Sequence, residues 1–383
     1  GYAGVMAANR LTQRNDVTVT LVNPRPHFVH RIRLHQVVGA TGDAAVDFGQ
    51  ILADRVRLVV DTVTRIDAAG CRVTLAGGQS LGYDYLVYAA GSGSPDPSVP
   101  GAAEHAFMMA SMEEAQRLRS VLDTTPADAA VTVVGAGATG VEVAAELAAE
   151  GHRVTLVCGT VLHPYLHPKV RRRFARRLAT LGVTVIDGPG ARVTAVSRDA
   201  VQLADGRELA STVTIWTAGF SVPQLAAHSG LATDAAGRLL TDETLTSVDD
   251  DRIVAAGDSA APSGLPLRMS CQAANPLGAH AADTILHRIT GERPTDIVVG
   301  FFGQCVSLGG GTAVVQFASK NDISKRFALG GLLAAKIKSS SFAGLIGHLA
   351  HEARKPGSYR WKFRDDTRRQ RLQTEHHEAI AAR

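Results

Sequence analysis

The sequence predicts an α/β protein that contains two copies of one strand–turn–helix unit. Residues 131–134 form a short apolar run, followed by Gly135-Ala-Gly137-Ala-Thr-Gly140 and an alanine-rich helical segment. A similar order recurs at the start of the chain, where Gly1-Tyr-Ala-Gly4 precedes a helical segment and the run VTLV at 19–22, which matches VTLV at 154–157. Because the spacing of the two copies agrees within one residue, we interpret them as an internal repeat.

The glycine spacing of the second copy is typical of a turn that binds a dinucleotide. Gly135 permits a tight turn, Gly137 lets backbone N–H groups approach a pyrophosphate, and Gly140 lets the helix pack against the strand. The positive end of the helix then faces the phosphates. The alternative is a glycine-rich turn in another α/β unit, and the strand before the glycines and the helix after them count against it. We therefore predict two Rossmann-like dinucleotide-binding domains.

The first copy is incomplete in this sequence. Gly1 and Gly4 correspond to Gly137 and Gly140, so the leading strand and the first glycine of the motif would precede residue 1. We therefore expect the natural chain to begin earlier.

Composition excludes several classes of protein. With 45% hydrophobic and 20% charged residues, the chain is typical of a globular protein, and it has no run of 18 apolar residues that could span a membrane. Its four cysteines are far apart and form no CxxC pair. His163 and His167 are four residues apart, but the adjacent Pro164 and Pro168 argue against a helix that would align them. We therefore expect neither a disulfide framework nor a metal site.

Hydrophobic patterns and turn residues place the elements in order. Residues 1–22 predict a helix and a strand, and residues 26–39 predict a helix. Residues 92–105, rich in proline, glycine and serine, predict a linker. The remaining expectations are strands at 57–63, 72–75, 85–89 and 183–186, a hairpin at 192–204, a strand that ends at Trp216-Thr-Ala-Gly219, mixed loop at 221–250, a strand that ends at Gly257-Asp258, a helix at 271–290, short strands within 301–317, and loose order after Lys355.

Taken together, these motifs resemble those of the flavoproteins with two dinucleotide-binding folds, the pyridine nucleotide-disulfide oxidoreductase superfamily. Within it, the chain is most similar to the type II NADH dehydrogenase and apoptosis-inducing-factor-like branch, over about residues 1–300. The resemblance rests on the two glycine turns, Glu142, Ala89–Gly91, the strand end at Gly219, and Gly257-Asp258. It implies that the first fold binds FAD and is discontinuous, and that the second, inserted in it, binds NADH or NADPH.

The resemblance implies four segments and a set of cofactor contacts. Residues 1–105 and 221–297 would form the FAD domain, 106–220 the NAD(P) domain, and 298–383 a basic C-terminal segment. Asp258 would accept a hydrogen bond from the ribityl chain of the flavin, and the alternative is an aspartate that caps a turn or a helix. The full set of candidate cofactor-binding residues is Gly1, Tyr2, Ala3, Gly4, Asn23, Ala89, Gly91, Gly135, Gly137, Thr139, Gly140, Cys158, Gly219, Gly257, Asp258 and Gln272.

Two positions, Pro276 and Cys158, depart from the family pattern. Gln272 matches the first glutamine of the Ala-Gln-x-x-x-Gln pattern beside the quinone site of type II dehydrogenases, but Pro276 replaces the second. Cys158 stands where an acidic residue ordinarily holds the ribose hydroxyls, so NADH is not favoured over NADPH by that contact. Arg171, Arg172 and Arg173 could meet a 2′-phosphate, although a solvated helix face is the more ordinary role.

Catalytic candidates follow from the same resemblance. Glu142, expected in the first turn of its helix, would lie near the contact of nicotinamide and flavin, or would only stabilise the helix dipole. The redox CxxxxC of the disulfide reductases corresponds here to a segment without cysteine, so thiol–disulfide chemistry is not expected. Arg31, Arg33 and His35 of that segment could line the flavin, His35 as a proton relay, or be ordinary surface and core residues. The catalytic candidates are Glu142, His35, Arg33 and Gln272.

Charge is concentrated at the C-terminus. Residues 319–383 carry 14 Lys/Arg and 6 Asp/Glu, a net charge of +8 against +4 for the whole chain. Such a segment can contact an anionic membrane surface, although a solvated basic tail is an equal alternative. We expect no nucleic acid partner, and we expect a cytoplasmic protein that could lie peripherally at the inner face of the membrane.

The sequence therefore predicts an FAD-dependent NAD(P)H dehydrogenase. Hydride would pass from NADH or NADPH to flavin N5, and electrons would then pass to an acceptor, for which the resemblance favours a quinone. The alternatives are a reductase of a small electron-carrier protein of the ferredoxin or rubredoxin type, and a redox sensor that holds FAD and NAD(P)H without turnover. The sequence leaves the oligomeric state undetermined.

Overall fold

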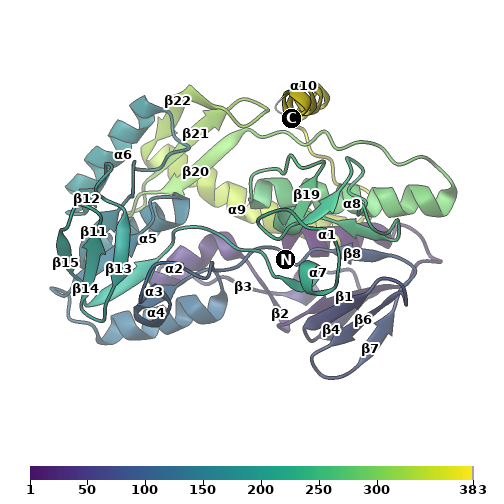
Figure 1. The fold of residues 1–383 in the computed structure, drawn as a ribbon, viewed down its shortest axis with the longest axis horizontal. Helices are drawn as coiled ribbons and strands as arrows, with labels where there is room; N and C mark the ends of the chain where they lie inside the picture. Colours follow the sequence, from purple (N-terminus) through teal and green to yellow (C-terminus); the bar gives the residue numbers. More distant parts are fainter. Residues whose placement is uncertain (382–383) are drawn as a thin grey trace.

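The computed structural model describes the backbone of residues 1–381 and the side chains of residues 1–374. A five-stranded parallel sheet forms one lobe, on the left of Figure 1, with strand order β12-β11-β10-β16-β9. Its elements are β9 (Ala106–Met108), α4 (Met112–Thr124), β10 (Ala130–Val134), α5 (Ala138–Ala149), β11 (Arg153–Val157), α6 (Pro168–Thr180), β12 (Thr184–Ile186) and β16 (Val213–Trp216). The predicted strand at 183–186 is thus confirmed.

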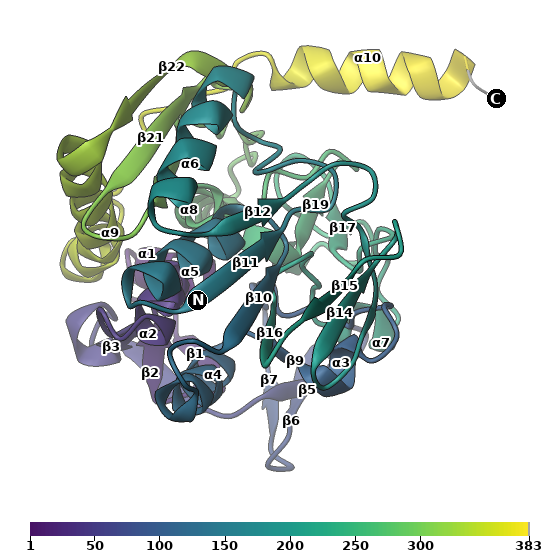
Figure 2. The same ribbon diagram turned by 90° about the vertical axis from the view of Figure 1, so that its left-hand side faces the viewer.

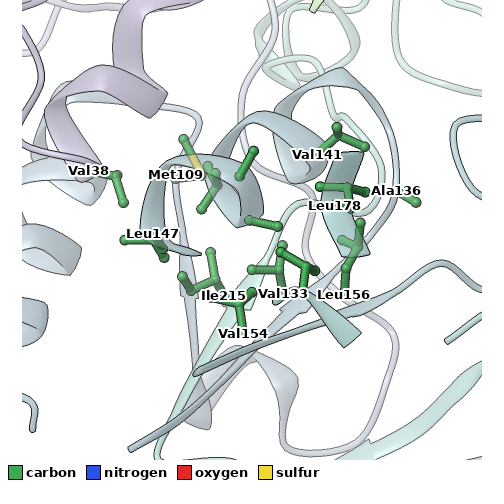
Figure 3. Packing of buried hydrophobic residues seen from close by; sticks show 14 of the residues in the cluster. Val38, Met109, Val133, Ala136, Val141, Leu147, Val154, Leu156, Leu178 and Ile215 are labelled. Atoms are coloured by element: carbon green, nitrogen blue, oxygen red, sulfur yellow. The ribbon is translucent and has the colours of Figure 1, made fainter. Parts of the chain in front are cut away.

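Both faces of this sheet are covered, as a parallel sheet requires. Val133, Leu156 and Ile215 are fully buried, and Figure 3 shows them packed near Val141 and Leu147 of α5. The predicted hairpin at 192–204 is confirmed as an antiparallel sheet beside this lobe. It consists of β13 (Val193–Val196), β14 (Ala200–Leu203) and β15 (Glu208–Ala210).

The first copy and the chain after the sheet form the second lobe. Here α1 (Tyr2–Leu11) packs on β1 (Val19–Asn23), which pairs in parallel with β4 (Val56–Val60). Strand β8 (Leu86–Tyr88) pairs in parallel with β18 (Ile253–Ala255), and α8 (Cys271–Thr290) then packs along α1. Because β8 and β18 lie on opposite sides of the inserted lobe in sequence, the predicted discontinuous domain is confirmed. The residue boundaries of the four segments stay a prediction.

Small elements complete the second lobe. An antiparallel sheet of β5 (Val63–Asp67), β6 (Arg72–Leu75) and β7 (Ser80–Gly82) lies at its edge. The others are the 3₁₀ turns η2 (Phe48–Gln50) and η3 (Gly257–Ser259), the helix α7 (Leu225–His228), and the parallel pair β17 (Leu239–Thr241) and β19 (Ala260–Pro262). The short helix α3 (Ala102–His105) packs instead against β13, beside the parallel sheet.

The helix predicted over residues 26–39 is wrong for most of its length. The segment forms strand β2 (His27–Val29), a 3₁₀ turn η1 (Arg31–Arg33) and only a short helix α2 (Leu34–Val38). Strand β2 pairs antiparallel with β3 (Ala45–Asp47), and Phe28 is buried between neighbours from distant parts of the chain. A partner strand that lies beyond the segment therefore overrode its local helical pattern.

The C-terminal segment is an integral part of the fold. Strands β20 (Gly303–Ser307), β21 (Ala313–Ala318) and β22 (Ser324–Gly330) form an antiparallel sheet, and α9 (Gly331–Arg354) packs between this sheet and α1. Figure 2 shows α10 (Arg368–Ala381) extending away from the rest of the chain. None of the helices within residues 1–381 combines the length and the apolar character needed to cross a bilayer.

The expectation of loose order after Lys355 is wrong as far as Arg368, and residues 382–383 of that stretch lie outside the described part of the chain. The Tyr359 N–H donates to Glu352, the Trp361 indole donates to the carbonyl of Gly300 at 2.8 Å, and Arg368 forms a salt bridge with Glu243 at 2.7 Å. Arg368 is only 4% exposed and also donates to two backbone carbonyls. These partners are distant in sequence, so the polar composition of the segment did not reveal them.

The close packing of α1 on α8 generates a stability prediction. A Cβ added at Gly278 of α8 would lie 2.2 Å from the Ala3 carbonyl oxygen, which is backbone and cannot move aside cheaply. We expect Gly278→Ala to lower the free energy of unfolding by about 1–3 kcal/mol through overpacking. Urea denaturation measures this change.

Gly344 of α9 is the matched control, because a Cβ there meets no atom within 4 Å. Gly344→Ala should stabilise by about 0.5–1 kcal/mol through helix propensity. Equal effects of the two substitutions would contradict the packing argument.

Candidate functional site

The turn between β10 and α5 has the shape of a phosphate cradle. Gly135 adopts φ +107°, and a Cβ at Gly140 would lie 1.8 Å from the Gly135 carbonyl oxygen, so both positions require glycine. A Cβ at Gly137 would meet no atom within 4 Å. The N-terminus of α5 therefore opens onto free space at Gly137, beside Ala138 and Thr139, where its N–H groups can bind a pyrophosphate.

The first glycine turn is similar. A Cβ at Gly1 also meets open space at the start of α1, next to Tyr2 and Ala3, whereas Gly4 lies against Ala89, with 3.5 Å between its added Cβ and the Ala89 Cβ. Gly91 follows with φ +73° and likewise faces open space. The structure thus brings together the predicted residues 1–4 and 89–91.

Asp258 lies just after strand β18, between the segment that follows β8 and the start of α8. Ser92 Oγ donates to its Oδ2 at 2.6 Å, and the Ser270 N–H donates to its Oδ1 at 3.1 Å. Gly257 has φ +76°, and its added Cβ would be 3.1 Å from the Ala3 Cβ. The carboxylate therefore adjoins the first glycine turn, at the C-terminal end of a parallel strand where ligands of such sheets bind.

A buried amide on α8 supports the fit to a bound group. Asn275 is 1% exposed, and neither its amide oxygen nor its amide nitrogen has a hydrogen-bond partner. It lies one helical turn after Cys271, whose thiol is close enough to Asp258 to interact electrostatically and whose pKa burial raises to about 12. Buried polar groups are ordinarily satisfied, so this pair of free atoms indicates a place for a ligand.

The amide of Gln272, predicted beside the acceptor, hydrogen-bonds to the backbone where β20 begins. Its Oε1 accepts the Phe302 N–H at 2.8 Å, and its Nε2 donates to the Gly303 carbonyl at 3.3 Å. Both ends of the amide therefore hold the start of β20, and neither is free for an acceptor in this arrangement.

The two strand ends carry neutral side chains. The Asn23 amide donates to the Arg25 carbonyl at 2.7 Å. Burial, together with the nearby charge of Asp187, raises the pKa of Cys158 to about 12, so this residue is an uncharged thiol. Arg171 of α6 donates through one guanidinium nitrogen to the Pro164 and Leu166 carbonyls of the loop before the helix.

Gly219, predicted at the end of β16, adopts φ +86° beside Pro95. Gly219 therefore lies just beyond the C-terminal end of β16, where the parallel sheet meets the predicted linker at 92–105.

His35, the predicted proton relay, is a buried and uncharged imidazole, and its role as a relay stays a prediction. His35 is 2% exposed, and burial lowers its pKa to about 4, so the imidazole is neutral near pH 7. Arg33 donates to Gln36 at 2.6 Å, and Arg31 donates to the Ser92 carbonyl at 2.8 Å. Arg31 thus lies beside the Asp258 group, whereas Arg33 is bound within its own turn.

Glu142 lies in the second turn of α5, which corrects its expected place in the first. It is 8% exposed, accepts the Ser307 N–H at 3.0 Å, forms an ion pair with Lys338 of α9, and lies 3.4 Å from His35 Nδ1. Burial raises the pKa of Glu142, but the nearby His35 and Lys338 and the Ser307 N–H outweigh burial and lower it overall. Because His35 is neutral near pH 7, Lys338 is the cation that compensates the carboxylate.

Sequence reasoning missed Lys338 and its neighbours. Lys338 is 196 residues from Glu142 and also donates to Ser307 Oγ at 2.6 Å. Its ammonium lies 5.1 Å from the ring of Phe342, which in turn contacts the rings of His30 and His35. The sequence contained one signal for this cluster. Lys338 interrupts a run of small apolar residues, and Phe342 follows four positions later, which places both side chains on the same face of a helix.

A further buried histidine lies against α6. His163 is fully buried against Phe174, neither ring nitrogen has a partner, and burial lowers its pKa to about 4. Within the described side chains, no group of three His, Cys, Asp or Glu could hold a metal ion.

His163 generates a pH prediction. The unfolded chain binds a proton at this residue below about pH 6.5, whereas the folded chain does so only near pH 4, so stability is lost as the pH falls between these values. His163→Asn should lower the slope of unfolding free energy against pH by about 1.4 kcal/mol per pH unit in this window. Asparagine tolerates the positive φ of 45° at this position.

Urea denaturation at several pH values measures the slope. The exposed His105, changed to asparagine, is the control and should leave the slope unaltered. An unchanged slope for H163N would contradict the assignment.

Residues 1–281 match the family described as pyridine nucleotide-disulphide oxidoreductase. A NADH dehydrogenase-like protein of Mycobacterium tuberculosis is 31% identical over 349 residues, which cover 82% of this chain and 85% of that protein. The type II NADH:quinone oxidoreductase Ndh of the same species is 29% identical, with 77% of this chain and 73% of that protein covered.

Solved structures share the fold. NDH2 from Plasmodium falciparum, in complex with NADH, has a TM-score of 0.78 at 16% identity and covers 94% of this chain and 97% of that chain. The sulfide:quinone oxidoreductase from Aquifex aeolicus has a TM-score of 0.77 at 18% identity, with 92% and 90% covered.

Proposed function

Because this chain belongs to the pyridine nucleotide-disulphide oxidoreductase family, we propose that it is an FAD-dependent NAD(P)H dehydrogenase whose electron acceptor is a quinone. The oxidoreductase activity and the two cofactors follow from the family and from its NADH dehydrogenase relatives. The observation that carries the acceptor half of the proposal is the buried Lys338–Glu142 pair, which places an ionisable group where the two lobes and the C-terminal segment meet.

The residues present fit FAD at the first glycine turn. Gly1 to Gly4 open the N-terminus of α1 to the pyrophosphate, and Asp258 accepts hydrogen bonds at the edge of the same turn. The start of α8 adds a positive helix end, where negative charge on a bound ring is stabilised. When bound, FAD supplies the two-electron chemistry that side chains lack.

The second turn fits NADH or NADPH. Gly135, Gly137 and Gly140 shape the pyrophosphate site, and Cys158 lies at the strand end that ordinarily contacts the adenosine ribose. A neutral thiol neither binds the ribose diol as a carboxylate would nor repels a 2′-phosphate. We therefore propose that the Cys158 position discriminates weakly between the two nucleotides.

Quinone as acceptor is supported by the relatives named NADH:quinone oxidoreductase and by the cluster around Glu142. A quinone must gain protons as well as electrons, and Lys338 and Glu142 form a charged pair in a region that otherwise contains the aromatic ring of Phe342 and neutral histidines. Pro276 stands at the position of the second glutamine, and the amide of Gln272 is already hydrogen-bonded to the backbone. The quinone pocket would therefore be built from different groups than in the family pattern.

Anaerobic stopped-flow spectroscopy tests this proposal. The flavin-loaded protein, mixed with NADH or with NADPH, should bleach at flavin wavelengths, with less than about a tenfold difference in kcat/KM between the nucleotides. A soluble quinone should then restore the colour rapidly. Bleaching followed by a stable coloured complex that no quinone discharges would favour a redox sensor, and fast discharge only by a ferredoxin-type protein would favour a carrier reductase.

A membrane surface is the proposed setting of quinone reduction. Four large apolar side chains are exposed just before β22, on β22 and at the start of α9, namely Ile323, Phe327, Leu332 and Leu333, at 64%, 63%, 70% and 59%. Four exposed cations lie on the same elements or next to them in sequence, namely Lys320, Lys325, Arg326 and Lys336. Apolar and basic side chains in one surface are suited to an anionic bilayer.

We expect the protein to sediment with anionic lipid vesicles at low salt and less so at high salt. The double variant F327E/L332E should reduce the bound fraction about tenfold, because it adds two carboxylates to the proposed surface. Val248→Glu, which changes an apolar residue that is 59% exposed elsewhere, is the control. Equal binding by all three proteins would overturn the membrane proposal.

A further inference from the structure

Three glutamates follow one face of α5. Glu142, Glu146 and Glu150 are spaced four residues apart, which places neighbouring Cβ atoms about 5–6 Å apart along a helix. Their exposure increases along the row, because Glu142 is buried, Glu146 is half-buried and Glu150 is exposed. The row therefore runs from the Lys338–Glu142 pair to the protein surface.

The two ends of the row are paired, and its middle is not. Glu142 binds Lys338, and Glu150 binds Arg119 of α4 at 3.0 Å. Among the described residues, Glu146 has no hydrogen-bond or ion-pair partner. It lies against the end of α2, where a Cβ added at Gly39 would be 2.8 Å from the Glu146 Cβ.

The charges that face Glu146 come from every element around it. Lys338 of α9, Glu142 of the same helix and Glu150 at its C-terminal cap act on Glu146 directly. Two further titratable or charged groups lie behind them. These are His35 of α2, which is neutral and adjoins Glu142, and Arg119 of α4, which binds Glu150. Burial raises the pKa of Glu146, Lys338 opposes this, and Glu142 and Glu150 raise it further, so the result is a raised pKa. A carboxyl group with a raised pKa takes up and releases a proton closer to neutral pH than an ordinary glutamate does.

Quinone reduction requires such a proton. In the overall reaction NADH + H⁺ + quinone → NAD⁺ + quinol, the nicotinamide supplies two electrons and one proton as hydride, and solvent supplies the second proton. Glu142 and Lys338 are only 8% and 4% exposed, so a proton that they deliver must be replaced from solvent through a more accessible group.

We propose that Glu146 is the relay that returns this proton from solvent to the Lys338–Glu142 pair. The relay rests on the proposed quinone reductase function. Glu146 acts through Glu142 and does not itself contact the acceptor. Its place between a buried ion pair and the surface, its free carboxyl group and its half-buried position carry the inference.

Activity measured with two different electron acceptors can distinguish a proton relay from a structural role of Glu146. Reduction of a soluble quinone consumes a proton, whereas reduction of two ferricyanide ions by NADH consumes none and releases one. Glu146→Gln should lower the rate with quinone about tenfold or more at about pH 8, and it should leave the ferricyanide rate and the bleaching by NADH within about twofold of wild type. Glu146→Asp should restore most of the quinone rate.

The pH profile gives a second signature. Glu146 must be protonated in order to deliver a proton. The rate of quinone reduction by the wild type should therefore fall as the pH rises through the raised pKa of Glu146. E146Q should lack this decline. The matched control is Glu208→Gln on the exposed strand β15, which should leave both rates and the profile unchanged.

Infrared spectroscopy provides a readout that is independent of turnover. The difference spectrum of the wild type between a pH below and a pH above the raised pKa of Glu146 should contain the carbonyl band of a protonated carboxyl group that E146Q lacks.

The outcomes separate the relay from the proposed function. If E146Q reduces quinone as fast as wild type, or loses quinone and ferricyanide rates equally, the relay is overturned while the proposed function stands. If wild type reduces ferricyanide but no quinone, both are overturned.

Discussion

The ion pair between Lys338 and Glu142 is the constraint on which the arrangement of the site depends. Removing one partner of a buried pair costs about 3–5 kcal/mol, because an uncompensated charge is left away from water. The pair therefore requires α9 to lie against α5, and Ser307 of β20 completes it by donating to Glu142 and accepting from Lys338. The C-terminal segment is for this reason a wall of the site rather than an appendage.

The far end of α9 is tied to the other nucleotide fold in the same way. Arg10 of α1 forms salt bridges with Asp283 of α8 and with Glu352 of α9, at 2.6 and 3.1 Å. The Asn9 amide donates to the Leu349 carbonyl at 3.1 Å. One helix thus connects the two helices that open the glycine turns, and a change in the position of α9 would move both ends of the site.

The electrostatic character of the site follows from burial. His35, Cys158 and Cys271 are uncharged near pH 7 because burial disfavours their ionised forms. The thiols therefore lack the thiolate character that disulfide exchange needs. The Lys338–Glu142 pair, whose net charge is zero, lies beside the aromatic ring of Phe342, and Glu146 is the carboxyl group through which that pair can reach solvent.

The sequence by itself determined the features that depend on neighbouring residues. The glycine spacing of residues 135–140, the helix 271–290 and the strand just before Gly257-Asp258 were predictable, because turns, helix starts and strand ends are encoded locally. The fold was predictable from the repeat of these units. Only the tertiary structure decided that residues 27–29 form a strand, that the chain after Lys355 packs through Arg368, and that Lys338 meets Glu142. Each of these depends on a partner far away in the chain, and no local pattern of residue types identifies such a partner.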